Sequence, residues 1–128
     1  MSQWDDLRMD SKISEALDVQ CHDKKHRSSR PFLTPHQIAI RFHDLFPHEF
    51  SILGKPIGGQ GAEKPDSLTQ YISQGLSKRI TQQLITNIEE CFLHTDNIHS
   101  LHYAKDGQIL ESSTQSHDLS MYRLRNIG

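Results

Sequence analysis

The sequence predicts one mainly helical domain with a small β-hairpin, which places it in the α+β class. Two observations support this prediction. Helix start signals at Thr34 and Ser67 each precede a run of apolar residues at helical spacing. An Asp-Gly pair at positions 106–107 separates two short stretches with the pattern of β-hairpin strands. The expected parts of the chain are an acidic then basic arm and linker (1–30), the domain (31–113) and a C-terminal tail (114–128).

Composition and charge limit the kinds of protein that this chain can be. It has 128 residues and a formal net charge of −2, which is not the strongly basic balance of a typical nucleic-acid binder. No apolar run approaches the roughly 18–20 residues that cross a bilayer, and the first ten residues lack the features of a signal peptide. We therefore expect a cytoplasmic protein without a membrane partner. In a reducing compartment Cys21 and Cys91 are expected as free thiols, although a disulfide between them stays open.

The charges are unevenly distributed along the first thirty residues. Residues 1–23 carry six acids and two bases, whereas residues 24–30 carry four bases and no acid. Several apolar residues between positions 2 and 19 fall on one side of an amphipathic helix. Two interpretations follow: a frayed arm, or a docking helix for a partner protein or a second copy, anchored by Trp4. The basic residues that could lie along phosphates are Lys24, Lys25, Arg27 and Arg30.

The domain is expected to open with a helix over residues 34–46. Thr34 is its N-cap, and Gln37 completes a capping box. Pro47 stops this helix, because the residue before a proline avoids the helical region. The same proline can open one further turn, which Gly54 ends. A glycine-rich loop is expected to lead from there to the next helix.

The stretch from residue 67 to residue 93 is expected to hold two further helices. Ser67 caps the first, with Gln70 at the reciprocal position. The second can start near Thr81, and its expected buried residues are Leu84, Ile85, Ile88 and Phe92. An alternative is one continuous helix over residues 67–92, because apolar residues also recur every four positions across the whole stretch. In that helix Gly75 would cost about 1 kcal/mol relative to alanine.

Residues 98–112 predict a β-hairpin. Asp106 and Gly107 form the type I′ turn, which needs positive φ at both positions. The expected cross-strand pairs are Lys105–Gln108, Tyr103–Leu110 and Leu101–Ser112. The apolar members of these pairs share one face, which we expect to be buried. Residues 119–124 of the tail leave two alternatives, an added strand or a disordered segment.

The sequence resembles the winged helix-turn-helix superfamily in two respects. One is the order of its expected elements: helix, extended piece, helix, helix and hairpin. The other is the motif at residues 70–80. Gly75 stands at the glycine of the turn, Leu76 at the apolar position after it, and Ser77 at the cap of the next helix. The positions that depart from the motif are Tyr71, Gln74 and Thr81, which leaves the register of the third helix open. The resemblance covers roughly residues 34–112. It implies a third helix in the major groove of DNA and a hairpin wing on the backbone or minor groove.

The resemblance implies a small DNA-binding or transcription-regulatory protein. The residues expected to contact nucleic acid are Lys78, Arg79, Gln82, Gln83 and Lys105. Lysine and arginine would meet phosphates, and glutamine can pair in bidentate fashion with adenine. Glu89 and Glu90 on the same expected helix would repel phosphates. The alternative is a protein-interaction module, an adaptor or inhibitor, without nucleic-acid binding. Double-stranded DNA and a protein are thus the two expected classes of partner.

No pattern in the sequence indicates an enzyme, a cofactor or a metal site. The side chains that could bind zinc are those of Cys91, His94, His99 and His102. Their spacing along the chain is not one that is common in zinc fingers. Residues three apart on a strand also point to opposite faces, which separates the last two histidines. The tripeptide at residues 58–60 matches the GGQ of class I peptide-release factors without the usual flanking residues. Because no nucleophile elbow or oxyanion site accompanies the serines and cysteines, we expect no catalytic residue.

Overall fold

The computed structural model describes residues 2–21, 30–58, 67–113 and 118–125. Over these residues the chain is an α+β domain with five helices and two antiparallel strand pairs, which confirms the predicted class. The helices are α1 (Gln3–Asp6), α2 (Met9–Ala16), α3 (Pro35–Leu45), α4 (Pro47–Leu53) and α5 (Leu68–Thr81). The strands are β1 (Ile88–Leu93), β2 (Ser100–Lys105), β3 (Gln108–Ser113) and β4 (Leu119–Leu124).

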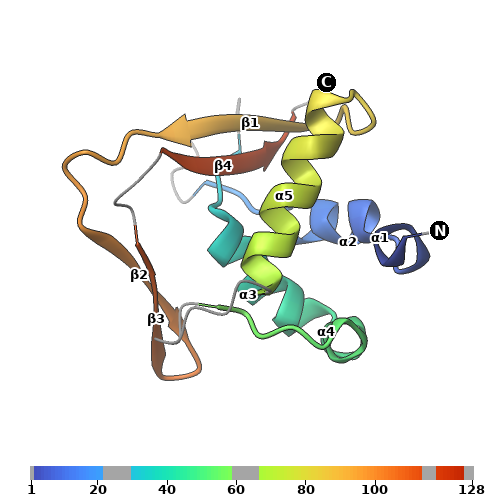
Figure 1. Ribbon diagram of the computed structural model, residues 1–128, viewed down its shortest axis with the longest axis horizontal. Helices are drawn as coiled ribbons and strands as arrows, with labels where there is room; N and C mark the ends of the chain where they lie inside the picture. The colour runs from blue at the N-terminus through green and yellow to red at the C-terminus, as the bar shows by residue number, and fades with distance from the viewer. Residues whose placement is uncertain (1, 22–29, 59–66, 114–117, 126–128) are drawn as a thin grey trace.

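The strand pairs lie on different sides of the helices. Figure 1 shows α5 crossing in front of α3, with α1 and α2 on one side and the β2–β3 hairpin on the other. The β1–β4 pair lies near the C-terminal half of α5, away from the hairpin. Leu33 forms a two-way backbone bridge with Tyr122, so the segment before α3 lies along the second edge of β4.

The helix caps are formed by the residues predicted for them. The backbone N–H of Gln37 donates to the Thr34 hydroxyl at 3.3 Å, and the Thr34 N–H donates to the Gln37 side chain at 2.8 Å. Gly54 ends α4 in the left-handed conformation, with φ of 64°. The N–H of Gln70 donates to the Ser67 hydroxyl at 3.1 Å. Local capping chemistry therefore sets these helix ends.

The predicted hairpin is also confirmed. Asp106 and Gly107 have φ of 49° and 79°, as a type I′ turn requires. The pairs are Lys105–Gln108, Tyr103–Leu110 and Leu101–Ser112, as expected from the sequence. Leu110 is buried on the inner face of the hairpin, whereas Ile109 on the outer face is 73% exposed.

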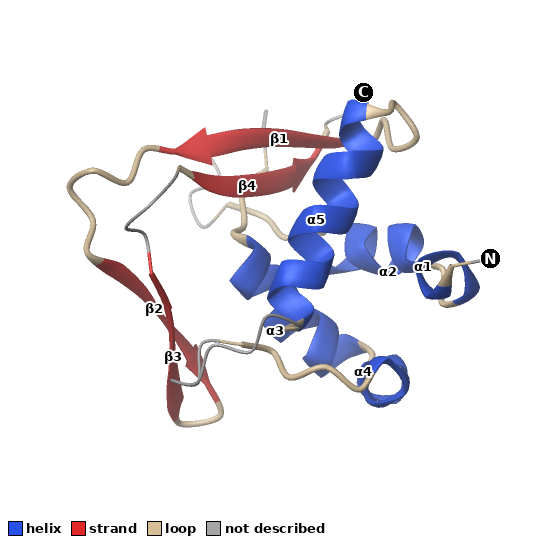
Figure 2. Ribbon diagram, in the orientation of Figure 1, coloured by secondary structure: helices blue, strands red, loops and turns tan. Residues whose placement is uncertain are grey.

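The predicted third helix near residues 81–92 is wrong, because α5 ends at Thr81 and β1 begins at Ile88 (Figure 2). Gln83 adopts φ of 59°, and backbone hydrogen bonds to the last turn of α5 close the helix there. Leu84 and Phe92, expected in the core, are 68% and 62% exposed. The strand forms because β4, which begins 31 positions after the start of β1, pairs with it over its whole length. The local pattern of apolar residues does not report this distant partner.

Gly75 lies inside α5 and makes no turn, so the helix-turn-helix predicted at residues 70–80 is not formed. The helix is continuous through Gly75, although it ends earlier than the single-helix alternative proposed. The role of the glycine is a close approach. A Cβ added there would lie 2.7 Å from Cη2 and 2.8 Å from Cε3 of the Trp4 ring. The absence of a side chain at Gly75 lets this ring lie against the backbone of α5.

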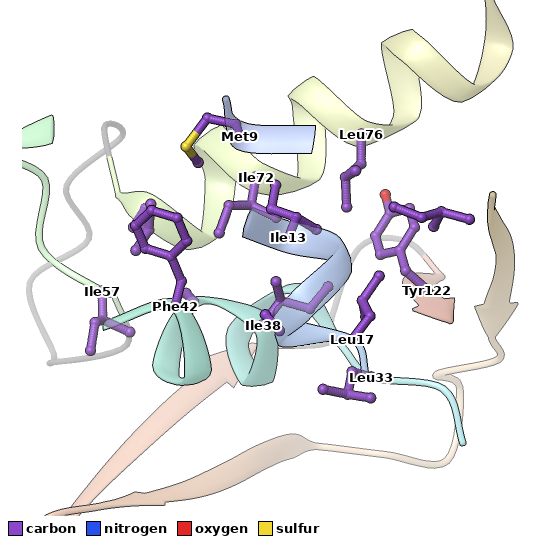
Figure 3. Close-up of a cluster of buried hydrophobic side chains, with 14 of the residues drawn as sticks. Met9, Ile13, Leu17, Leu33, Ile38, Phe42, Ile57, Ile72, Leu76 and Tyr122 are labelled. Carbon is purple, nitrogen blue, oxygen red and sulfur yellow. The ribbon is translucent and has the colours of Figure 1, made fainter. Parts of the chain in front are cut away.

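Residues 2–17, expected as part of an arm, belong to the core of the domain. Trp4, Met9 and Ile13 are buried, with exposed fractions of 2% or less. Figure 3 shows Ile13 between side chains of α5 and α3. Both interpretations of this segment, frayed arm and docking helix, are therefore wrong for the described residues. The apolar stripe faces the protein's own core because α1 and α2 fold back onto α3 and α5.

Part of the predicted C-terminal tail is a strand of the domain. Residues 119–124 form β4, and Tyr122 at its centre is fully buried. The strand alternative for this segment is thus the correct one. None of the helices in the described part of the chain has the length and apolarity needed to cross a membrane.

Candidate functional site

The structure does not bring the five predicted nucleic-acid contacts onto one surface. Lys78 and Arg79 lie in the last turn of α5, and Gln82 and Gln83 follow directly after it. Lys105 lies beside the turn of the β2–β3 hairpin. Figure 1 shows that turn and the end of α5 at opposite sides of the molecule. The predicted DNA-binding surface is therefore not assembled as the winged-helix resemblance implied.

Two of these five side chains are engaged within the fold. The guanidinium carbon of Arg79 lies 4.3 Å from the centre of the Trp4 ring, and its Nη1 donates to a carbonyl one helical turn earlier at 3.2 Å. The Nζ of Lys105 donates to Asp106 at 2.6 Å and to Asp44 at 2.7 Å. These hydrogen bonds raise the pKa of Lys105. Its charge is already opposed by two carboxylates, which weakens its attraction for a phosphate.

The remaining three residues are exposed at the wrong end of a helix for anion binding. Lys78, Gln82 and Gln83 lie at the C-terminal end of α5. That end of a helix carries partial negative charge, whereas phosphates favour the N-terminal end. Of the basic linker residues, Arg30 pairs with Asp18. The others, Lys24, Lys25 and Arg27, lie outside the described residues.

A groove of about 790 Å³ lies between α3 and β2. Its lining comes from residues 19–21 after α2, residues 31–33 before α3, residues 102–104 of β2, and α3 itself through Gln37, Ile40 and Arg41. More apolar than polar surface lines it. Pockets of roughly 300–1,000 Å³ with a few polar groups are typical binding sites. The groove is therefore the candidate functional site among the described residues.

Stacking holds β2 against α3 at this groove. The rings of Tyr103 and His36 lie 4.6 Å apart and are nearly parallel. His36 is buried, and its Nε2 lies 3.1 Å from the carbonyl oxygen of Gly58. Burial lowers the pKa of His36, so the imidazole is neutral at neutral pH and donates this hydrogen bond. The stack thus holds this part of β2 against α3.

One edge of β2 at the groove has no backbone partner among the described residues. In a hairpin with a two-residue turn, the residues beside the turn form a hydrogen-bonded pair, and every second pair along the ladder repeats it. Tyr103–Leu110 is such a pair, because it stands two positions from Lys105–Gln108. The backbone N–H and C=O of His102 and Ala104 therefore point away from β3. No backbone hydrogen bond joins them to another segment in the described part of the chain.

Arg41 supplies the positive charge of the groove. Its Nε donates to the carbonyl of Ala16 at 2.6 Å, which holds the side chain beside the end of α2. Within the described ranges no carboxylate pairs with its guanidinium, and no Asp or Glu lines the groove. The guanidinium has five N–H donors, of which this contact uses one. The other donors have no hydrogen-bond partner in the described part of the chain, so an anionic ligand can use them.

A polar cluster around Ser77 and the thiol of Cys91 lie outside the groove. The hydroxyl of Ser77 donates to Glu90 at 2.8 Å and lies 2.7 Å from the hydroxyl of Tyr122. Tyr122 is fully buried, and its hydroxyl and that of Ser77 are both engaged with Glu90. Cys91 lies half-buried on β1 opposite Met121, and burial raises the pKa of its thiol, which disfavours the reactive thiolate. No three His, Cys, Asp or Glu side chains of the described residues are placed to hold a metal ion.

Sequence reasoning missed the groove because its walls come from segments far apart in the chain. Residues 19–21 were expected in the arm and linker, and residues 102–104 in a wing. One part of the groove could be predicted from the sequence. The Asp-Gly turn at residues 106–107 sets the hydrogen-bond register of the hairpin, and this register decides which backbone groups of β2 point away from β3. Nothing local distinguishes Arg41 from a solvated helix residue. Comparisons with protein-family models, curated proteins and solved structures gave no match to this chain.

Proposed function

We propose that this protein is a protein-interaction module that binds a segment of a partner polypeptide in the groove between α3 and β2. The observation that supports this most is the preformed groove, which combines apolar walls with the fixed cation of Arg41. The stack of Tyr103 on His36 holds one wall in place, so little ordering is required on binding. An adaptor or inhibitor function needs such a surface and no catalytic group.

The expected DNA-binding function draws less support from the same residues. Lys105 is paired with two acids, and Lys78 lies at a helix end that disfavours phosphates. The exposed groups that favour it are Gln82, Gln83 and Lys78 itself. We therefore treat binding of double-stranded DNA as the competing outcome of the test below.

Replacing Gln20, an exposed residue of the groove lining, by tryptophan is expected to weaken peptide binding at least tenfold by narrowing the groove. A displayed library of random dodecapeptides is selected on the immobilised protein, and the enriched peptides are synthesised with a fluorophore. Their affinities for wild type and Gln20→Trp are compared by fluorescence anisotropy. Gln3→Trp, at an exposed position of α1 outside the groove, is the matched control and should bind as wild type does.

Two outcomes would contradict this function. One is the absence of peptide enrichment over the bare support, and the other is equal affinity of the selected peptides for wild type and Gln20→Trp. A labelled 20-base-pair DNA duplex is titrated in parallel at low salt. Binding of the duplex that Lys78→Gln weakens, together with no selected peptide, would favour the nucleic-acid function instead.

A further inference from the structure

We propose that the ligand of the groove is an extended acidic peptide, which adds as a strand beside β2 and places a carboxylate on Arg41. This inference rests on the proposed function, because it names the conformation and the chemistry of the segment that the groove binds. Three features of the groove support it: an edge of β2 without a backbone partner among the described residues, a guanidinium without a carboxylate partner among them, and the apolar wall of the groove.

The exposed backbone groups of β2 favour a ligand with an extended polypeptide backbone. His102 and Ala104 each present an N–H and a C=O on the side away from β3, two residues apart. A peptide in the β conformation carries matching donors and acceptors at the same repeat, and this match is the basis of strand addition to exposed sheet edges. A helix has no free backbone groups along its length, and a nucleic-acid backbone has no regular N–H donors. The edge therefore favours a polypeptide strand over these two classes.

The positive charge of Arg41 favours an acidic residue in the bound peptide. Arg41 lines the groove, and within the described residues neither a carboxylate partner nor an acidic lining residue opposes its charge. The contact of its Nε with Ala16 fixes the position of the guanidinium. A guanidinium held in this way can donate two parallel hydrogen bonds to a carboxylate. An acidic side chain or a C-terminal carboxylate of the peptide provides it.

The apolar wall sets the spacing of the other peptide residues. Phe32, Leu33 and Ile40 line the groove beside Arg41. Side chains of a strand alternate between two faces, so only every second peptide residue can point into the groove. Selected peptides should therefore carry apolar residues at positions an even number of residues away from one Asp or Glu.

The backbone contact is tested by Ala104→Pro, which removes an outward N–H of β2 at the groove, against Ile109→Pro, which removes an outward N–H of β3 on the opposite edge of the hairpin. Proline is tolerated on strand edges because the N–H it lacks is not used within the sheet. The selected peptides are expected to bind Ala104→Pro at least tenfold more weakly than wild type, and Ile109→Pro as wild type. Methylating alternate backbone nitrogens of the peptide should abolish binding to the unaltered protein in one register and spare it in the other.

The charge contact is tested by Arg41→Gln against Arg8→Gln, an exposed arginine outside the groove. Affinity should fall at least tenfold for Arg41→Gln, remain unchanged for Arg8→Gln, and recover in part for Arg41→Lys. A second selection on Arg41→Gln should lose the preference for Asp and Glu. Circular dichroism and thermal unfolding check that each variant is folded.

The outcomes separate this inference from the proposed function. Peptides that bind wild type and lose affinity for Gln20→Trp establish the groove as a binding site. If those peptides are insensitive to backbone methylation in both registers, strand addition is overturned while the function stands. If they lack an acidic residue and bind Arg41→Gln normally, the charge contact is overturned. The absence of any groove-dependent peptide overturns both.

Discussion

Gly75→Ala is expected to lower the free energy of unfolding by about 2 kcal/mol, although alanine is the better helix former. In an open helix the same change would stabilise by about 1 kcal/mol. In α5 the added Cβ would lie 2.7 Å from Cη2 of Trp4, which forces the ring out of a packed position. Overpacking of this kind costs about 1–3 kcal/mol and sometimes more. The guanidinium of Arg79, which lies over the Trp4 ring, would lose this contact as well.

Chemical denaturation of Gly75→Ala and of a matched control measures this effect. The control is Gln74→Ala, at the exposed neighbouring position of α5, which should change stability by less than about 0.5 kcal/mol. In a Trp4→Leu background the clash is removed, so Gly75→Ala should become neutral or stabilising. Stabilisation of the otherwise wild-type protein by Gly75→Ala would show that the ring does not contact α5 at this position.

Tyr122→Phe is expected to destabilise the protein by about 1–3 kcal/mol, because it removes one hydroxyl from a buried hydrogen-bond network. The hydroxyl of Tyr122 lies 2.7 Å from the Ser77 hydroxyl and donates to Glu90 at 3.0 Å. Burial raises the pKa of Tyr122, so the hydroxyl keeps its proton at physiological pH. Without it, Ser77 and Glu90 lose a partner where α5 packs on the β1–β4 pair.

Tyr103→Phe is the matched control for this change. Its hydroxyl has one side-chain contact, with Ser112 at 3.2 Å on the partly exposed hairpin, so its loss should cost less than about 1 kcal/mol. Unfolding in urea, followed by circular dichroism, compares the two variants with wild type. Equal midpoints for the two variants would contradict a joining role for the Tyr122 network.

Features that depend on local chemistry could be predicted from the sequence. The Thr34 and Ser67 caps and the Asp-Gly turn are decided by a few neighbouring residues, and the structure forms all three. The stretch 88–93 could not be assigned, because its strand depends on pairing with residues 119–124. Apolar residues at every fourth position fit a helix as well as a strand, as long as the pairing with residues 119–124 is unknown.

The same limit explains the errors at Gly75 and at the N-terminus. A glycine followed by Leu76 and a possible cap at Ser77 suggests a turn when its neighbours in space are unknown, whereas here the ring of Trp4 requires the glycine. The stripe from Trp4 to Leu17 is amphipathic in either case, and only the fold shows that its apolar side packs on α3 and α5. The groove residue Arg41 is likewise defined by its surroundings, since its own sequence context resembles any exposed helix.

The unpaired edge of β2, on which the proposed binding mode depends, is tested most directly by amide hydrogen exchange of the free protein. Measured residue by residue by NMR, the amides of His102 and Ala104 should exchange rapidly, whereas that of Tyr103, bonded to β3, should be protected. Adding a selected peptide should then slow exchange at His102 and Ala104. Slow exchange at both of these amides in the free protein would contradict the proposal, because the edge would already be paired.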